Sequence, residues 1–156
     1  MPTVEQLAIP PQYGNPGTLL AWPDVETRLA GASHYWLATT RPDGRPHVVP
    51  LDGLWVDGRW YFGGADTTVR HRNLLADGRA ALHLADATSA VIVDGVCTIE
   101  QPSDEFASDL AARSKAKYGY GPPASVYKGG VWALRPVRVM AWTDLTVDAT
   151  RFLFEP

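Results

Sequence analysis

The chain has 156 residues, of which 46% are hydrophobic and 20% charged, and its formal net charge is −3. This length suits one globular domain, and the composition excludes a disordered chain. The negative charge argues against a nucleic-acid binder that depends on bulk positive charge, and a single cysteine excludes a disulfide-built secreted domain. The start of the chain lacks the pattern of a signal peptide, and no stretch is apolar enough to cross a membrane. We therefore expect a cytoplasmic protein.

The first part of the chain is rich in proline. Residues 1–23 hold five of the thirteen prolines, so we expect an extended N-terminal arm ahead of a domain over residues 24–156. Asp24 is expected to cap a short helix over residues 25–30, which ends near Gly31.

Strands are expected next. Residues 34–40 are rich in aromatic and β-branched side chains, and Pro42-Asp43-Gly44 supplies a turn into a strand over residues 46–56. Asp57-Gly58 is a strong hairpin signal that leads into a strand over residues 59–63.

A helix is predicted over residues 69–76, with Thr67 or Thr68 as its cap. Two more strands follow, over residues 79–85 and 90–100. The next helix begins at Ser103 and carries acidic residues in its first turn and lysines in its last, which suits the helix dipole.

The last quarter of the chain begins with a glycine-rich loop over residues 119–130. A long strand over residues 131–144 follows, kinked or bulged near Pro136, and a short last strand covers residues 151–154. About six strands and two or three short helices predict a mainly β, α+β fold. The expected architecture is an antiparallel β-barrel with short rim helices.

Several common catalytic motifs do not occur in this sequence. It has no dinucleotide-binding glycine fingerprint, no phosphate loop and no nucleophile elbow, and its four histidines lack the spacing of a metal motif. No nucleophile can be paired with a base, so no catalytic residue and no metal ligand is assigned. An enzyme of this sequence would depend on a bound cofactor.

The start of the helix over residues 69–76 is the first candidate site. Thr67 and Thr68 stand where free backbone N–H groups favour an anion, Arg70 lies in the first turn, and Asn73 lies one turn further along. An arginine fork can grip a phosphate. The alternative is a capped surface helix with solvated arginines.

The strand over residues 46–56 is the second candidate. Pro50 and Gly53 interrupt it, so a flat ring can rest against exposed backbone there. The alternative is a barrel corner that binds nothing, and His47 is interpreted as structural. Residues 117–121 either close over a ligand or simply end a helix.

Aromatic side chains are the third candidate feature, with six Trp, six Tyr and four Phe. Those in the strands are expected in the core. Near the C-terminus, Trp132, Trp142, Phe152 and Phe154 either pack in the core, line an interface or stack on a ring.

The order of these segments resembles the pyridoxamine 5′-phosphate oxidase-like family of flavin and deazaflavin oxidoreductases, which share a split β-barrel fold. The resemblance covers about residues 24–154. The matching segments are residues 37–50 (LATTRPDGRPHVVP), 60–64 (WYFGG), 68–74 (TVRHRNL), 93–95 (VDG), 117–119 (KYG), 135–142 (RPVRVMAW) and 150–154 (TRFLF).

The resemblance implies a homodimer with two cofactor sites at the subunit interface and a small-molecule substrate. The cofactor would be FMN or the deazaflavin coenzyme F-420, whose acidic tail Arg70, Arg72 and Lys117 would meet. An alanine- and arginine-rich composition slightly favours F-420. The residues that match the family's cofactor site are Val48, Val49, Pro50 and Leu51 beside the ring, Gly63 and Gly64 along the ribityl chain, Thr67, Thr68, Arg70 and Asn73 at the phosphate, and Trp142 and Arg151 facing the partner's site.

Two residues depart from the family's pattern. Asp52 stands where relatives often carry a bulky aromatic residue, and a carboxylate there would repel an anionic reduced flavin. Val69 replaces a second basic residue of the true oxidases, which argues against pyridoxamine phosphate oxidase activity itself. The first hypothesis is therefore a hydride-transferring oxidoreductase. The alternatives are a cofactor-binding or carrier protein without turnover and a structural dimer with an empty site.

Overall fold

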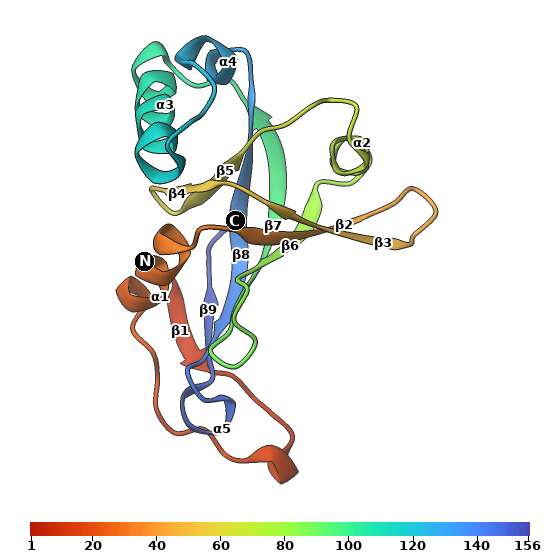
Figure 1. The fold of residues 1–156 in the computed structure, drawn as a ribbon. Coiled ribbons are helices and arrows are strands. Elements are labelled where there is room, and N and C mark those ends of the chain that lie inside the picture. Colours follow the sequence, from red (N-terminus) through yellow and green to blue (C-terminus); the bar gives the residue numbers. More distant parts are fainter.

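The computed structural model describes residues 1–156 and shows an antiparallel sheet with helices along its edges (Figure 1). Seven strands follow one another in the order β1-β9-β8-β7-β6-β2-β3, and a β4–β5 hairpin joins the sheet through β5 and β8. The strands are β1 (Thr3–Gln6), β2 (Tyr35–Thr40), β3 (Pro46–Leu51), β4 (Leu54–Val56), β5 (Arg59–Phe62), β6 (Arg79–His83), β7 (Val91–Glu100), β8 (Val131–Ala141) and β9 (Thr150–Leu153).

The sheet does not close on itself, so the architecture is the split β-barrel that the family resemblance implies, within the mainly β, α+β class that the sequence predicts. Seven of its nine strands match the seven ranges expected from the sequence, which were counted as about six strands. The two additional short strands are β1, inside the proline-rich segment, and β4, which the sequence pattern merged with β3. A bulge opposite Asp94 and Gly95 confirms the predicted irregularity of β8 near Pro136.

Five helices lie at the edges of the sheet. They are α1 (Trp22–Gly31), α2 (Val69–Ala76), α3 (Asp104–Tyr118), α4 (Ala124–Lys128) and α5 (Leu145–Asp148). Figure 1 shows α3 and α4 side by side at one end of the molecule, with β1 and α5 toward the other end. No helix has the length and apolar character needed to span a lipid bilayer.

The observed helix ends can be compared with the caps that the sequence predicts. The hydroxyl of Thr68 caps α2 by accepting the backbone N–H of His71 at 3.3 Å, as predicted for one of the two threonines. Ser103 caps α3 in the same way. The predicted cap at Asp24 is wrong: α1 begins one turn earlier, at Trp22, because Pro23 fits the first turn, where an N–H has no partner. Asp24 lies inside that turn.

The proline-rich segment pairs with the end of the chain. β1 lies antiparallel to β9, and the backbone N–H of Leu7 continues the contact by donating to the carbonyl of Ala149 at 2.9 Å. Further along, Gly17 donates to the carbonyl of Val147 at 3.1 Å. These bonds lay residues 3–17 along the β9–α5 end of the sheet.

Two predicted elements need correction. The strand expected over residues 46–56 is broken into β3 and β4, because the chain bends at Asp52-Gly53. The loop expected over residues 119–130 contains the short helix α4, which packs against α3. Both corrections concern the walls of one cleft, since the bend faces the segment that joins α3 to α4.

The hydrophobic core has two parts. The larger cluster lies inside the barrel and includes the fully buried Tyr35, Trp60 and Phe152. The smaller cluster joins the β4–β5 hairpin and β8 to α3 and α4, with Leu110 at its centre. This second cluster holds the two helices against the barrel and so fixes the cleft between them.

Candidate functional site

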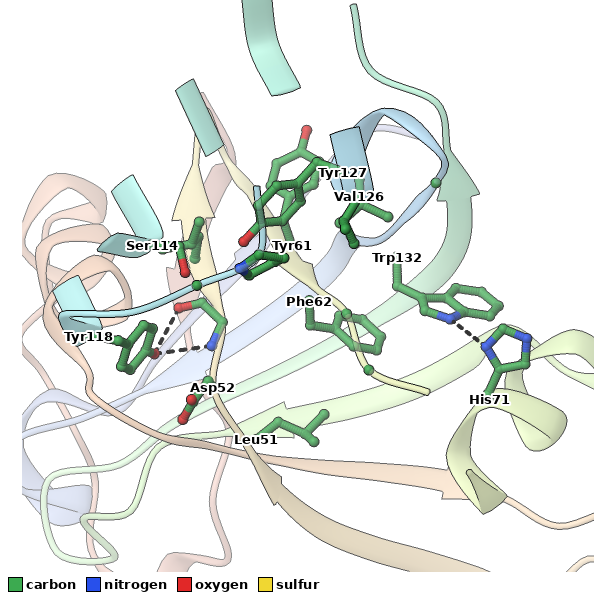
Figure 2. Close-up of a pocket in the computed structure, with 18 of the residues that line it drawn as sticks. Leu51, Asp52, Tyr61, Phe62, His71, Ser114, Tyr118, Val126, Tyr127 and Trp132 are labelled. Atoms are coloured by element: carbon green, nitrogen blue, oxygen red, sulfur yellow. Dashed lines mark hydrogen bonds between the residues drawn. The ribbon is translucent and has the colours of Figure 1, made fainter. Parts of the chain in front are cut away.

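A cleft of about 1020 Å³ opens between the β3–β4 bend, the end of β5, the start of α2 and the α3–α4 segment (Figure 2). Cofactor and drug-sized sites usually measure about 300–1,000 Å³, so the cleft has room for a large ligand. Each wall comes from a different part of the chain, and the second core cluster holds them together.

The walls are largely aromatic. The ring-bearing side chains that line the cleft are Tyr61, Phe62, Tyr118, Tyr120, Tyr127 and Trp132. Phe62 lies nearly parallel to Trp132, with ring centroids 6.2 Å apart and an interplanar angle of 12°. Behind Phe62, the buried ring of Trp60 stacks at 4.4 Å. These stacked rings make a flat, rigid surface.

One end of the cleft is set by a bond between Trp132 and His71. The indole N–H of Trp132 donates to Nδ1 of His71 at 3.1 Å, and Figure 2 shows the two side chains from β8 and α2 facing each other. A nitrogen that accepts a hydrogen bond carries no proton, so the neutral His71 ring keeps its proton on Nε2. The bond fixes both rings at this end of the cleft.

The β3–β4 bend is held by the last turn of α3. The hydroxyl of Tyr118 accepts the backbone N–H of Gly53 at 3.1 Å, and Nζ of Lys117 donates to the carbonyl of Gly53 at 3.0 Å. Lys117 also donates to the hydroxyl of Tyr35 at 2.9 Å. Burial lowers the pKa of Lys117 to about 8, although the charge of Asp52 acts in the opposite direction. The bend is therefore tied to α3 at its backbone.

These bonds place the carboxylate of Asp52 at the cleft wall. Tyr120 donates its hydroxyl to Oδ2 at 3.0 Å, and Nε2 of His34 lies 3.3 Å from Oδ1. The hydrogen bond to this carboxylate raises the pKa of Tyr120. In Figure 2, Asp52 and Tyr118 lie at one end of the cleft and His71 at the other. Asp52, noted in the sequence only as a departure from a family pattern, is thus a cleft residue.

The other end of the cleft is basic. The guanidinium of Arg70 donates to the carbonyl of Gly63 at 3.1 Å but forms no ion pair, and burial lowers its pKa. Nδ1 of His47 is buried without a hydrogen-bond partner. Burial, followed by the charges of Arg41 and Arg70, lowers the pKa of this histidine. The guanidinium of Arg70, which has no carboxylate partner, makes this end of the cleft suited to an anion, whereas His47 does not line the cleft.

His47, interpreted from the sequence as structural, lies on the same half-buried face of β3 as Val49 and Leu51 and does not line the cleft, so that interpretation stays a prediction. The sequence missed the neighbours of Asp52, because His34 and Tyr120 lie far from it in sequence and no local pattern joins them.

The structure brings five of the expected site residues together. They line the cleft: Pro50, Leu51, Gly63, Gly64 and Arg70. Gly64 has a φ of +118°, a conformation that a larger residue rarely adopts, and the guanidinium of Arg70 fills the space where its Cβ would lie.

Four others lie beside the cleft but do not line it. Val49 is half-buried on β3, and Thr67 is exposed ahead of α2. The hydroxyl of Thr68 is used by the helix cap. Asn73 is buried and donates its side-chain amide to the hydroxyl of Thr39 at 3.0 Å.

The remaining three expected residues lie on other surfaces. Val48 is half-exposed on the outer face of β3. Arg151 forms an ion pair with Glu5 of β1, with 2.8 Å between Nη2 and Oε1. Trp142 follows β8 and is half-buried. One copy of the chain does not bring these three residues to its own cleft.

The chain is similar to one known protein family and to several solved structures. The family model described as pyridoxamine 5′-phosphate oxidase matches residues 21–143. A comparison with curated protein sequences finds no significant match.

Solved structures show the same fold at low identity. An F-420 reductase is 20% identical, with a TM-score of 0.57 over 72% of this chain and 93% of that chain. A conserved hypothetical protein from Mycobacterium tuberculosis is 19% identical, with a TM-score of 0.68 over 85% and 89%. A heme-binding protein from Mycobacterium smegmatis is 23% identical, with a TM-score of 0.57 over 81% and 60%.

Proposed function

The chain belongs to the pyridoxamine 5′-phosphate oxidase family, and we propose that its cleft binds a flavin-type cofactor. The protein would then be an oxidoreductase that transfers a hydride between this cofactor and a small organic substrate. The two candidate cofactors are coenzyme F-420 and FMN. Either one supplies the two-electron chemistry, and the protein supplies binding and orientation.

The observation that carries this proposal is the contrast between the two ends of the cleft. Phe62 and Trp132 present a flat aromatic wall, and the guanidinium of Arg70 at the basic end has no carboxylate partner. A flat ring joined to a phosphorylated chain has this same division between an apolar part and an anionic part. The space beside Gly63 is open, since a Cβ there would meet no atom within 4 Å.

The chain's own residues would then hold the two parts of the cofactor. Arg70 would pair with the phosphate, because its guanidinium has no carboxylate partner and a charge-assisted bond is strong when partly buried. The bend at Asp52-Gly53, tied to α3 by Tyr118 and Lys117, would keep the wall in place during turnover. The α3–α4 segment would cover the cleft and exclude water.

The two cofactors differ at the basic end. The acidic tail of F-420 is longer than the single phosphate of FMN and needs more cations. Arg72 follows Arg70 by two residues on α2 and does not line the cleft, but it is exposed and its long side chain is available to such a tail. Lys117 is not, because its ammonium already donates to the carbonyl of Gly53, the hydroxyl of Tyr35 and the carbonyl of Ala30. Binding of the acidic tail of F-420 would therefore depend on Arg70 and Arg72 without Lys117.

A homodimer would complete the site. The outer face of the sheet carries Trp36, 37% exposed, and Val48, 50% exposed, beside Pro50, which lines the cleft. His83 stacks on Trp36, with ring centroids 6.3 Å apart and an angle of 14°. A second copy packed on this face would bury these side chains and lie next to the cleft. Trp142 and Arg151 would then reach the partner's site.

A carrier without turnover is the second candidate. Asp52 favours it, because a carboxylate at the cleft wall disfavours a negatively charged reduced ring. A structural neighbour is described as a heme-binding protein. A steady-state assay with the reduced cofactor and a panel of enones separates the two functions: an oxidoreductase turns over, whereas a carrier binds and does not.

The experiment that tests the cofactor site is a titration of three proteins with FMN and with F-420. Arg70→Glu should weaken binding by about 100-fold or more, since it removes a charge-assisted bond and adds repulsion. Arg113→Glu makes the same change on α3, where Arg113 is paired with Asp109 and does not line the cleft, so it should bind like the wild type. Equal affinities for all three proteins would refute the assignment of Arg70.

A further inference from the structure

The end of the cleft at Asp52 differs in charge from the end at Arg70. Two carboxylates line the cleft: Asp66 lies in the loop between β5 and α2, near Arg70, and Asp52 lies at the opposite end. The guanidinium of Arg70 donates to the carbonyl of Gly63 at the basic end. No arginine or lysine side chain forms an ion pair with Asp52, which lies 3.3 Å from the imidazole of His34. The Asp52 end therefore offers a carboxylate that no arginine or lysine of the cleft lining pairs with.

The carboxylate of Asp52 keeps capacity for a further partner. Its side chain is 40% exposed, and each oxygen has one neighbour that can donate, Nε2 of His34 and the hydroxyl of Tyr120. A carboxylate offers about four acceptor positions, so about two remain. Both neighbours also fix the direction of the carboxylate, because each holds a different oxygen.

Lys117 is not the further partner of Asp52, although its positive charge is close enough to interact with that carboxylate. Its ammonium donates to three oxygens of the chain itself, those of Gly53, Tyr35 and Ala30, and the side chain does not line the cleft. The ammonium also lies 4.9 Å from the ring centre of Tyr35 and 5.3 Å from that of Tyr118. It is thus held behind the cleft wall.

The rings around Asp52 complete the arrangement. Tyr118 and Tyr120 lie at this end, with ring centroids 6.3 Å apart, and Tyr61 and Tyr127 continue the wall. The faces of aromatic rings carry partial negative charge and attract organic cations, and the attraction grows as water is excluded. A carboxylate within an aromatic wall is a recognised combination for binding such cations.

We propose that the Asp52 end of the cleft binds an organic cation, such as an amidinium or an N-alkylated aromatic ring, through the carboxylate of Asp52 and the surrounding tyrosine rings. This inference deepens the proposed function, because it names the class of substrate for the same cleft, and it rests on that function for the role of the cation as a substrate. The binding itself requires no cofactor and is tested without one.

The test compares two probes of nearly equal shape, cationic benzamidine and neutral benzamide, by isothermal titration calorimetry of the purified protein. Wild type should bind benzamidine about fivefold or more tightly than benzamide. Asp52→Asn should reduce this preference to about twofold or less, because the amide keeps the shape and loses the charge. Asp57→Asn is the matched control, since Asp57 lies in the β4–β5 turn outside the cleft, and it should keep the wild-type preference.

A second variant guards against misfolding of the first. Tyr120→Phe keeps the ring and the carboxylate but removes the hydroxyl that donates to Oδ2, so the preference for benzamidine should persist or grow. The preference should also weaken in high salt, as screening of an exposed charge requires.

Equal binding of the two probes by wild type, or an unchanged preference in Asp52→Asn, would overturn the inference. The outcome is separate from that of the cofactor titration. Failure to bind FMN or F-420 would leave a charge preference at Asp52 intact, whereas loss of the preference would leave the phosphate assignment of Arg70 intact.

Discussion

Replacing Gly53 with alanine places a methyl group where the core has no room. The new Cβ would overlap Nε1 and Cε2 of the Trp60 indole and lie 2.7 Å from its Cζ2. Trp60 cannot move aside, because it is fully buried, stacks on Phe62 and packs against the tilted ring of Tyr35. The backbone of residue 53 would have to shift, which strains its bonds to Tyr118 and Lys117.

Overfilling a packed core typically costs about 1–3 kcal/mol, so Gly53→Ala should lower the free energy of unfolding by that amount. For a chain of this length, the loss corresponds to a fall in Tm of about 3–10 °C. Urea denaturation and thermal melts, both followed by circular dichroism, measure the two quantities.

Gly17→Ala is the matched control, because a Cβ at Gly17 would meet no atom within 4 Å and its φ is not positive. It should leave the stability within about 1 kcal/mol of the wild type, or raise it slightly. If Gly53→Ala is as stable as Gly17→Ala, the close contact between the bend and Trp60 is wrong, and so is the position of Asp52 that depends on it.

Three further predictions concern other parts of the molecule. Folding lowers the pKa of Lys117 from 10.5 to about 8, so the unfolded chain holds a proton that the folded chain releases between those values. The contribution of Lys117 to stability should therefore rise with pH across this range, and a parallel series with Lys117→Met should lack that rise. Val48→Glu should convert the proposed homodimer to a monomer, as measured by light scattering, whereas Val147→Glu on α5 should not; a dimer that survives Val48→Glu contradicts the proposed interface. His71→Leu should cost about 1–3 kcal/mol in urea denaturation, since it leaves the indole N–H of Trp132 without an acceptor, and an unchanged midpoint would contradict this bond.

Local signals explain why much of the fold was predictable. The turn at Asp57-Gly58 requires positive φ at both residues, and the observed values are 49° and 75°. The cap at Thr68 and the left-handed Gly119 at the end of α3 are likewise decided by neighbouring residues. Elements whose stabilising bonds are made within a few residues can be recognised from the sequence.

The elements that were missed depend on partners far away in the chain. β1 has hydrogen-bond partners only because β9 lies beside it, and its four residues have no strand signal of their own. α4 is one short turn that packs on α3. Pro50 and Gly53 indicated an interruption of the strand, but the buried ring of Trp60 that leaves no room for a Cβ at residue 53 is not visible in any local pattern.

The two ends of the candidate site differ in the same way, since one depends on neighbouring residues and the other on residues from distant segments. The Arg70 end was predicted because a helix start, its cap and its first-turn arginine are adjacent in sequence. The Asp52 end gathers His34, Tyr118 and Tyr120 from separate segments, so its geometry follows only from the fold. The surface residues Val48 and Arg151 need a second copy of the chain before they can contribute to a site.

The most direct test of the account is a titration of the purified protein with FMN and, separately, with F-420, followed by tryptophan fluorescence. Trp132 lines the cleft and Trp60 lies behind it, so a bound flavin-type ring should quench both. The account predicts that one of the two cofactors binds with a Kd of about 1 µM or lower. Binding of neither cofactor below about 100 µM would contradict the proposal that this cleft is a flavin-type site.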